Sequence, residues 1–141
     1  MVNSKWRGNL LRIHTERSRQ IEKLIYVCTP YSASTVNELF ENLELAKRVC
    51  RRVLTENDVP VAPHLYFPRL TRSKEAGINC SVKLLEKCDA VYVSGGRITQ
   101  GMAKEIEIAA SLGIPIKCVA DPKYAEQRKL KENMEGENEH E

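Results

Sequence analysis

Long apolar runs, aromatic residues and paired cysteines are all scarce in this chain of 141 residues, and each scarcity excludes a class of protein. No stretch approaches the roughly 20 apolar residues of a transmembrane helix, and no N-terminal apolar segment resembles a secretory signal. The five cysteines form no C-x-x-C pair, which argues against a zinc site and for isolated thiols in a reducing compartment. We therefore expect a cytoplasmic protein with no metal, no cofactor and no membrane partner.

Neither basic nor acidic residues are clustered enough to predict a charged binding surface. The chain has 22 basic and 19 acidic residues and a net charge of +3 at pH 7. Basic residues are in excess in residues 1–22, and acidic residues are in excess in residues 121–141. A nucleic-acid surface needs clustered positive charge together with stacking aromatic rings, and only 6% of the residues are aromatic. We expect no nucleic-acid partner.

The length and the hydrophobic content of 42% allow one modest core, which we place in residues 23–120. Residues 1–22 are expected to form a basic amphipathic N-terminal arm packed on the domain or on a second subunit, with a nucleic-acid or membrane role as the alternative. Asp121 and Pro122 predict the start of a C-terminal helix. An acidic disordered tail is expected from residue 136 onward.

Strand-like and helix-like segments alternate within this domain. Four short apolar runs predict strands at residues 23–29, 59–62, 90–93 and 114–119. Two of these runs hold Cys28 and Cys118, which we expect in the core. Apolar residues at helical spacing predict helices between the strands, the first capped by Thr35 or Asn37, and residues 64–73 are expected to form a loop. Strands separated by crossover helices pair in parallel, so the sequence predicts an α/β fold: a small doubly wound (flavodoxin/Rossmann-like) parallel sheet of four to five strands.

One glutamate lies on the apolar side of the helix expected after residue 100. At about 100° per residue, Met102 and Leu112 fall on one side of that helix, and Glu105 projects from the same side. Burying this carboxylate without a partner would cost several kcal/mol or raise its pKa. Tyr26 and His64 are candidate partners. Glu105 is therefore a candidate functional group, the alternative being a structural carboxylate with satisfied hydrogen bonds.

The ligand crevice of an open parallel sheet lies at the carboxyl ends of its strands. Three loops reach that edge: residues 29–35, 64–71 and 94–100. Gly95 and Gly101 permit a close approach of the backbone to a ligand, and Thr99 can cap a helix whose N-terminus favours an anion. A phosphate or a sugar hydroxyl is the expected guest.

These residues resemble the nucleoside 2-deoxyribosyltransferase-like superfamily. Its signature is a strand, a loop, a glycine followed four residues later by a glutamate nucleophile, and then a glycine and a proline that lead into the last strand. Gly101, Glu105 and Gly113 match this pattern, and the segment IYVCTPYS is similar to the opening strand of the family, with its tyrosine at Tyr26. The resemblance covers residues 23–119.

The resemblance implies a reaction in which a carboxylate attacks C1′ of a deoxyribose, the base leaves, and water or another base resolves the glycosyl-enzyme intermediate. Glu105 would be the nucleophile and Tyr26 would orient it. Thr99 stands where transferases usually have an aspartate. A hydroxyl at this position is similar to the 2′-deoxynucleoside 5′-monophosphate N-glycosidases, in which the residue at this position helps to hold the 5′-phosphate. The implied ligand-binding residues are Tyr31, Ser32, Ser34, His64, Tyr66, Phe67, Gly95, Thr99, Gly101 and Met102.

One position departs from the family. The enzymes carry a second acid eight residues before an aspartate that is matched here by Asp89, and this chain has Ser81 there. Protonation of the leaving base typically contributes about 10²- to 10⁴-fold in rate.

The sequence thus predicts an N-glycosidase or deoxyribosyltransferase acting on a nucleotide or nucleoside. A non-catalytic binder of a nucleotide-derived molecule is the alternative. A third interpretation takes Ser94 and the following two glycines as a remnant of the PGG loop of phosphoribohydrolases. The resemblance also implies a homodimer or a higher homo-oligomer.

Overall fold

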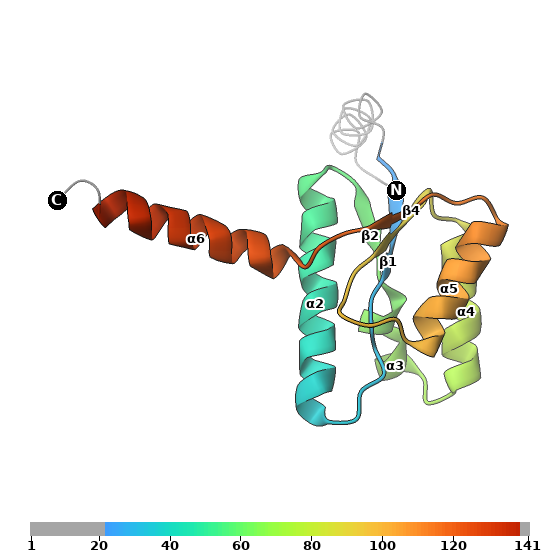
Figure 1. Cartoon of the computed structure of the whole chain (residues 1–141). Coiled ribbons are helices and arrows are strands. Elements are labelled where there is room, and N and C mark those ends of the chain that lie inside the picture. Colours follow the sequence, from blue (N-terminus) through green and yellow to red (C-terminus); the bar gives the residue numbers. More distant parts are fainter. Residues whose placement is uncertain (1–21, 139–141) are drawn as a thin grey trace, which may run out of the picture.

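Four parallel strands form the sheet of the computed structural model, which describes residues 22–138 (Figure 1). The strands are β1 (Leu24–Cys28), β2 (Val59–Val61), β3 (Ala90–Val93) and β4 (Ile116–Cys118). Their spatial order is β2-β1-β3-β4, and every neighbouring pair is parallel. The predicted doubly wound parallel sheet is confirmed, with four strands. The N-terminal arm predicted for residues 1–22 lies outside the described residues except for residue 22.

Helices connect these strands as the apolar spacing predicted. They are α2 (Val36–Thr55), η1 (Pro63–Leu65), α3 (Phe67–Leu70), α4 (Lys74–Glu86) and α5 (Gln100–Ser111), and one further helix, α6 (Pro122–Asn138), follows β4. Thr35 caps α2 and Thr99 caps α5 through their side-chain oxygens. The loop predicted for residues 64–73 instead contains two short helices, because Pro63 and Pro68 occupy first-turn positions at which proline favours a helix.

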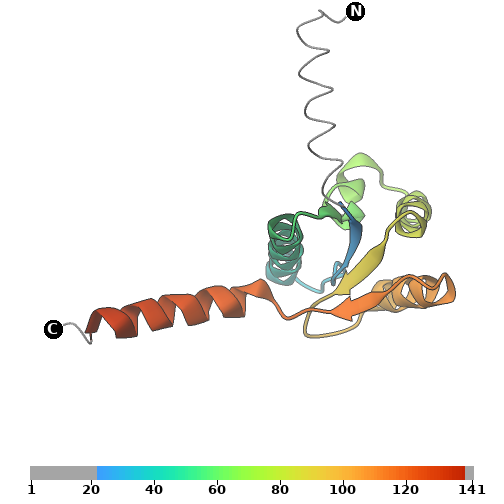
Figure 2. The ribbon, with the colours of Figure 1, turned by 90° about the horizontal axis from the view of Figure 1, so that it is seen from above.

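The central strand β1 is buried on both faces of the sheet. Ile25 and Val27 pack on the side covered by α2, whereas Tyr26 and Cys28 pack on the side covered by α4 and α5 (Figures 1 and 2). None of the four residues is more than 1% exposed. Such burial on both faces explains why this run is continuously apolar. It also places the side chains of Tyr26 and Cys28 beneath α5.

The last strand, β4, is present as predicted and lies exposed at the edge of the sheet. All three of its residues are exposed, including Cys118, which we had expected in the core. Leu112, expected on the apolar side of α5, is 53% exposed at the end of that helix. The strand β4 is exposed because α6 leads away from the sheet and does not cover it (Figures 1 and 2).

Helix α6 projects from the domain (Figure 1). An ion pair joins the residue before its first turn to α2. Arg48 of α2 donates from Nε and Nη2 to the two carboxylate oxygens of Asp121, at 2.8 and 2.9 Å. Three apolar side chains of α6 are 62–67% exposed: Tyr124, Leu130 and Met134. The helix continues to Asn138, past residue 136 where we had expected disorder to begin. Its glutamates favour a helix, and the single Gly136 costs only about 1 kcal/mol.

Within residues 22–138, the structure contains no helix that is both long and apolar enough to cross a lipid bilayer.

Candidate functional site

The order of the strands reverses at β1, which has β2 on one side and β3 on the other. In doubly wound sheets the ligand crevice lies outside the carboxyl ends of the strands at such a reversal. The loops that follow β1 and β3 therefore flank the expected crevice. Both loops were among the three that the sequence predicted.

Glu105 lies on the sheet-facing side of α5, as the helical spacing predicted. Its neighbours on that side, Met102 and Ala109, are 2% and 0% exposed. Burial raises the pKa of the Glu105 carboxyl above its ordinary value, and hydrogen bonding to Cys28 and Tyr26 partly offsets this rise. The carboxylate is therefore half-buried, and two groups that can donate hydrogen bonds, the Cys28 thiol and the Tyr26 hydroxyl, lie beside it.

Both donors stay protonated at neutral pH. Burial raises the pKa of the Tyr26 hydroxyl and of the Cys28 thiol, and the neighbouring Glu105 charge raises each further. The sequence proposed Tyr26 as a partner of Glu105 but did not identify Cys28. The sequence could have predicted Cys28 as a second neighbour of Glu105, because side chains two residues apart in a strand, such as those of Tyr26 and Cys28, point to the same face.

Ser81 of α4 also reaches this cluster. Ser81 lies beside Tyr26, and its Oγ donates to the Gly77 carbonyl at 2.8 Å. Asp89 lies at the start of β3, at the opposite end of the sheet from the crevice, and its carboxylate accepts the Leu24 N–H at 2.8 Å. Ser81 therefore lies beside Tyr26, whereas Asp89 binds the backbone of β1 at the other end of the sheet.

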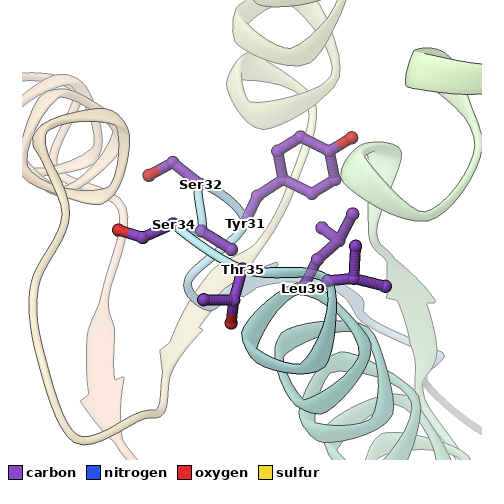
Figure 3. A pocket seen from close by; sticks show the side chains of 7 residues that line it. Tyr31, Ser32, Ser34, Thr35 and Leu39 are labelled. Carbon is purple, nitrogen blue, oxygen red and sulfur yellow. The ribbon is translucent and has the colours of Figure 1, made fainter.

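A pocket of about 440 Å³ opens at the loop between β1 and α2 (Figure 3). It is lined by Tyr31, Ser32, Ala33, Ser34, Thr35, Val36 and Leu39. Asn42 supports this loop by donating from Nδ2 to the carbonyls of Tyr31 and Ser32, both at 3.3 Å. In Figure 3 the Ser32 and Ser34 hydroxyls point away from the Tyr31 ring. Glu105 does not line the pocket, but its partner Cys28 lies three residues before Tyr31 in the chain.

Arg97 joins the loop after β3 to the loop after β1. Its Nη2 donates to the Ser32 carbonyl at 2.6 Å and to Glu38 Oε1 at 2.7 Å. The other oxygen of Glu38 accepts the Ser34 N–H at 2.9 Å. Arg97 was not among the residues that the sequence predicted for the site. Arg97 could have been predicted as a binding residue, because it lies two residues before the cap Thr99 in a loop expected to bind an anion.

The structure pairs His64 with Thr29 and not with Glu105. The Thr29 hydroxyl and His64 Nε2 are 2.8 Å apart, which joins the carboxyl end of β1 to η1. Burial lowers the pKa of His64 to about 4, so the imidazole is neutral at pH 7. Tyr66 packs on Phe67, with ring centroids 4.6 Å apart and an interplanar angle of 37°. Both aromatic rings, expected to stack on a base, here contact each other.

His64 makes stability sensitive to acid. A folded-state pKa of about 4, below the ordinary 6.5, means that its contribution is complete above pH 6.5 and is lost as the pH falls toward 4. From urea denaturation at pH 7 and pH 4.5, we expect the unfolding free energy to fall by up to about 3 kcal/mol through this group. The variant His64→Gln should lose less stability over the same interval. An equal loss in both proteins would show that His64 is not responsible.

Thr99 and two glycines shape the start of α5. The Thr99 Oγ accepts the Met102 N–H at 3.2 Å, so this amide, expected to bind a ligand, is engaged within the helix. A Cβ added at Gly101 would approach nothing more closely than the Thr99 Oγ, at 3.9 Å, which leaves that backbone open. Gly95 has φ 129°, and a Cβ there would lie 2.8 Å from Pro30 Cδ. Gly95 therefore allows the two loops to pack together.

The variant Gly95→Ala should be destabilised by about 2 kcal/mol or more, since it adds both backbone strain and a contact with a rigid proline ring. Gly96→Ala is the matched control, because a Cβ there meets nothing within 4 Å and its φ is not in the left-handed range. Urea denaturation should show a near-normal midpoint for the control. Equal midpoints for the two variants would refute this role of Gly95.

Solved structures with the same fold include two 2-deoxyribosyltransferases. The enzyme from Leishmania mexicana is 21% identical, with a TM-score of 0.54 over 70% of this chain and 64% of that protein. The enzyme from Bacillus psychrosaccharolyticus is 18% identical, with a TM-score of 0.50 over 70% of this chain and 72% of that one. A conserved protein from Enterococcus faecalis V583 is 19% identical, with a TM-score of 0.51 over 70% of this chain and 63% of that one.

These matches confirm the resemblance at the level of fold: the chain has a nucleoside 2-deoxyribosyltransferase-like fold. It spans less than two thirds of the Leishmania and Enterococcus proteins. Within this fold class it belongs to the family described as a domain of unknown function, DUF7768, whose model matches residues 23–119. Among curated proteins no sequence matches the chain.

Proposed function

We propose that the protein is an N-glycosidase or deoxyribosyltransferase that cleaves the glycosidic bond of a nucleotide or nucleoside with Glu105 as its nucleophile. The observation that carries this proposal is the half-buried Glu105 carboxylate, which lies beside Tyr26 and Cys28 of β1, the strand at which the strand order reverses. The fold shared with two proteins named as 2-deoxyribosyltransferases supports it.

In the first step an oxygen of Glu105 attacks C1′ of the sugar. The new C–O bond forms as the C1′–N bond breaks, and the base leaves with the bonding electrons. Water or a second base then attacks C1′ and releases the carboxylate. Removal of water makes the ionised carboxylate reactive, while hydrogen bonds from Tyr26 and Cys28 favour the ionised form and orient it.

The pocket at the loop between β1 and α2 suits a sugar and a base. It combines the hydroxyls of Ser32, Ser34 and Thr35 with the apolar surfaces of Tyr31 and Leu39. The remaining groups that we propose to contact the ligand are the neutral His64, Tyr66, Gly95, Thr99, Gly101 and Met102.

We also propose that a second copy of the chain covers this pocket in a homodimer or higher homo-oligomer. Val36 and Phe40, on the first turns of α2 beside the pocket, are 84% and 59% exposed and offer an apolar surface for it. Light scattering after gel filtration tests this assembly directly, and a monomer at all concentrations would contradict it.

A non-catalytic binder is the alternative, and the hydroxyl of Ser81 favours it. A family acid at this position would reach the Tyr26 and Glu105 cluster, whereas a serine cannot supply a proton to the leaving base at neutral pH. Such a protein would bind a nucleotide through the same pocket and leave it intact.

One experiment separates the two functions. The protein is incubated with the nucleoside 5′-monophosphates and the deoxynucleosides in turn, free base is measured by chromatography, and thermal unfolding is recorded with each compound. Release of base from a deoxynucleotide or deoxynucleoside supports the enzyme. Thermal stabilisation without release supports the binder. If no compound is cleaved or raises the melting temperature, both proposals are contradicted.

A further inference from the structure

The guanidinium of Arg97 lies between the two loops that flank the crevice. It extends from the β3–α5 loop, and its Nη2 contacts Ser32, which lines the pocket, and Glu38 in the first turns of α2. The reaction proposed above assigns no role to Arg97. Its position is nevertheless two residues before Thr99, which caps α5.

We propose that Arg97 binds the 5′-phosphate of the substrate and so selects a nucleotide over its nucleoside, an inference that rests on the proposed function of the site. Groups that suit a phosphate lie on both loops. The loop after β1 carries the hydroxyls of Ser32 and Ser34, which line the pocket, and Arg97 contacts the backbone of this loop at Ser32. Arg97 itself precedes by two residues Thr99, which caps the N-terminus of α5. A nucleoside has no phosphate, so it has no negative charge for these groups to bind.

The ion pair with Glu38 does not prevent this role. The side chains of Arg97 and Glu38 are 51% and 36% exposed, and ion pairs at such exposure contribute only about 0–1 kcal/mol. A phosphate carries more charge and more acceptor oxygens than a carboxylate, so it can replace Glu38 at little cost. Both contacts described for Arg97 also use Nη2, and a guanidinium has five N–H donors. Arg97 can therefore engage a phosphate with or without releasing Glu38.

Glu38 holds Arg97 in place until the ligand arrives. One of its carboxylate oxygens accepts from Arg97, and the other accepts the Ser34 N–H at 2.9 Å. Its own N–H donates to Thr35 Oγ1 at 3.1 Å. The carboxylate thus occupies the N-terminus of α2 and directs the guanidinium toward the rim of the pocket.

Calorimetric titration tests the proposal in the Glu105→Gln protein, so that no ligand is consumed. The probes are the four common deoxynucleoside 5′-monophosphates and the four matching deoxynucleosides. We expect tighter binding of a nucleotide than of its nucleoside. Arg97→Gln should weaken nucleotide binding by about tenfold or more and leave nucleoside binding unchanged, whereas Arg97→Lys should retain part of the difference. Arg51→Gln, an exposed arginine near the far end of α2, is the control of equal charge and should change neither.

The proposal is overturned if the parent protein binds nucleotide and nucleoside equally, or binds neither. It is also overturned if Arg97→Gln weakens both ligands alike, because that result would assign Arg97 a structural role in joining the loops. Catalysis is judged separately. Base release that depends on Glu105 but not on Arg97 would leave the proposed function standing without this inference. Arg97-dependent nucleotide binding by a protein that releases no base would leave the inference standing and favour the binder.

Discussion

Glu105→Gln should abolish base release, with a loss of about 10⁴-fold or more, while the protein remains folded. The amide keeps the size of the side chain but cannot form the glycosyl-enzyme bond at a useful rate. The measurement is the initial rate of base release from the best nucleotide or nucleoside of the panel. Glu107→Gln is the matched control, because Glu107 lies two residues away on the exposed side of α5 and should keep normal activity.

Stability separates a lost nucleophile from a damaged fold. Because the folded-state pKa of Glu105 is raised, its contribution to stability is complete below the unfolded-state pKa and is lost as the pH rises through the folded-state pKa. Glutamine mimics the neutral carboxyl at every pH. The variant should therefore be at least as stable as the wild type at pH 7 in urea denaturation. A variant that loses activity and is also less stable would not support a catalytic role.

Ser81→Asp should increase base release by about 10²-fold, the lower end of what general acid catalysis contributes. Ser81 lies beside Tyr26, which in turn lies beside Glu105, so an acid at position 81 would be next to the proposed nucleophile. The nearby Glu105 charge should raise the pKa of the new carboxyl and keep it protonated to higher pH. The expected rate therefore falls as the pH rises through that pKa.

Ser81→Asn is the control for the aspartate, since it has nearly the same shape but no acidic proton. The comparison requires initial rates from pH 5 to pH 9 for the wild type and both variants. Equal rates for the aspartate and asparagine variants would mean that this position does not protonate the leaving base. That result would favour either a proton donor elsewhere or the binding function.

Local patterns in the sequence were sufficient to predict much of this domain. The alternation of strands and helices, the caps at Thr35 and Thr99, and the orientation of Glu105 all depend on residues within a few positions of one another. The choice between Tyr26 and His64 as the partner of Glu105 was not local. It required knowing that Tyr26 faces α5 and that His64 meets Thr29.

The errors concern features that depend on the whole chain. Cys118 was expected in the core because it lies in an apolar run, and nothing within that run shows that β4 occupies the exposed edge of the sheet. The contacts of Arg97 could not be predicted for a similar reason, because its partners Ser32 and Glu38 lie 65 and 59 residues away in the chain. Contacts at such separation leave no periodic signal in a single sequence.

The central claim is that Glu105 forms a covalent bond to the sugar, and mass spectrometry of the intact protein tests it most directly. The protein is mixed with a cleaved deoxynucleotide or deoxynucleoside, quenched in acid within the first turnover, and digested to locate the added mass. We predict a gain of one deoxyribosyl unit, with its phosphate where the substrate has one, on the peptide that contains Glu105. Release of base by a Glu105→Gln protein at the wild-type rate, with no adduct on that peptide in the wild type, would contradict the account.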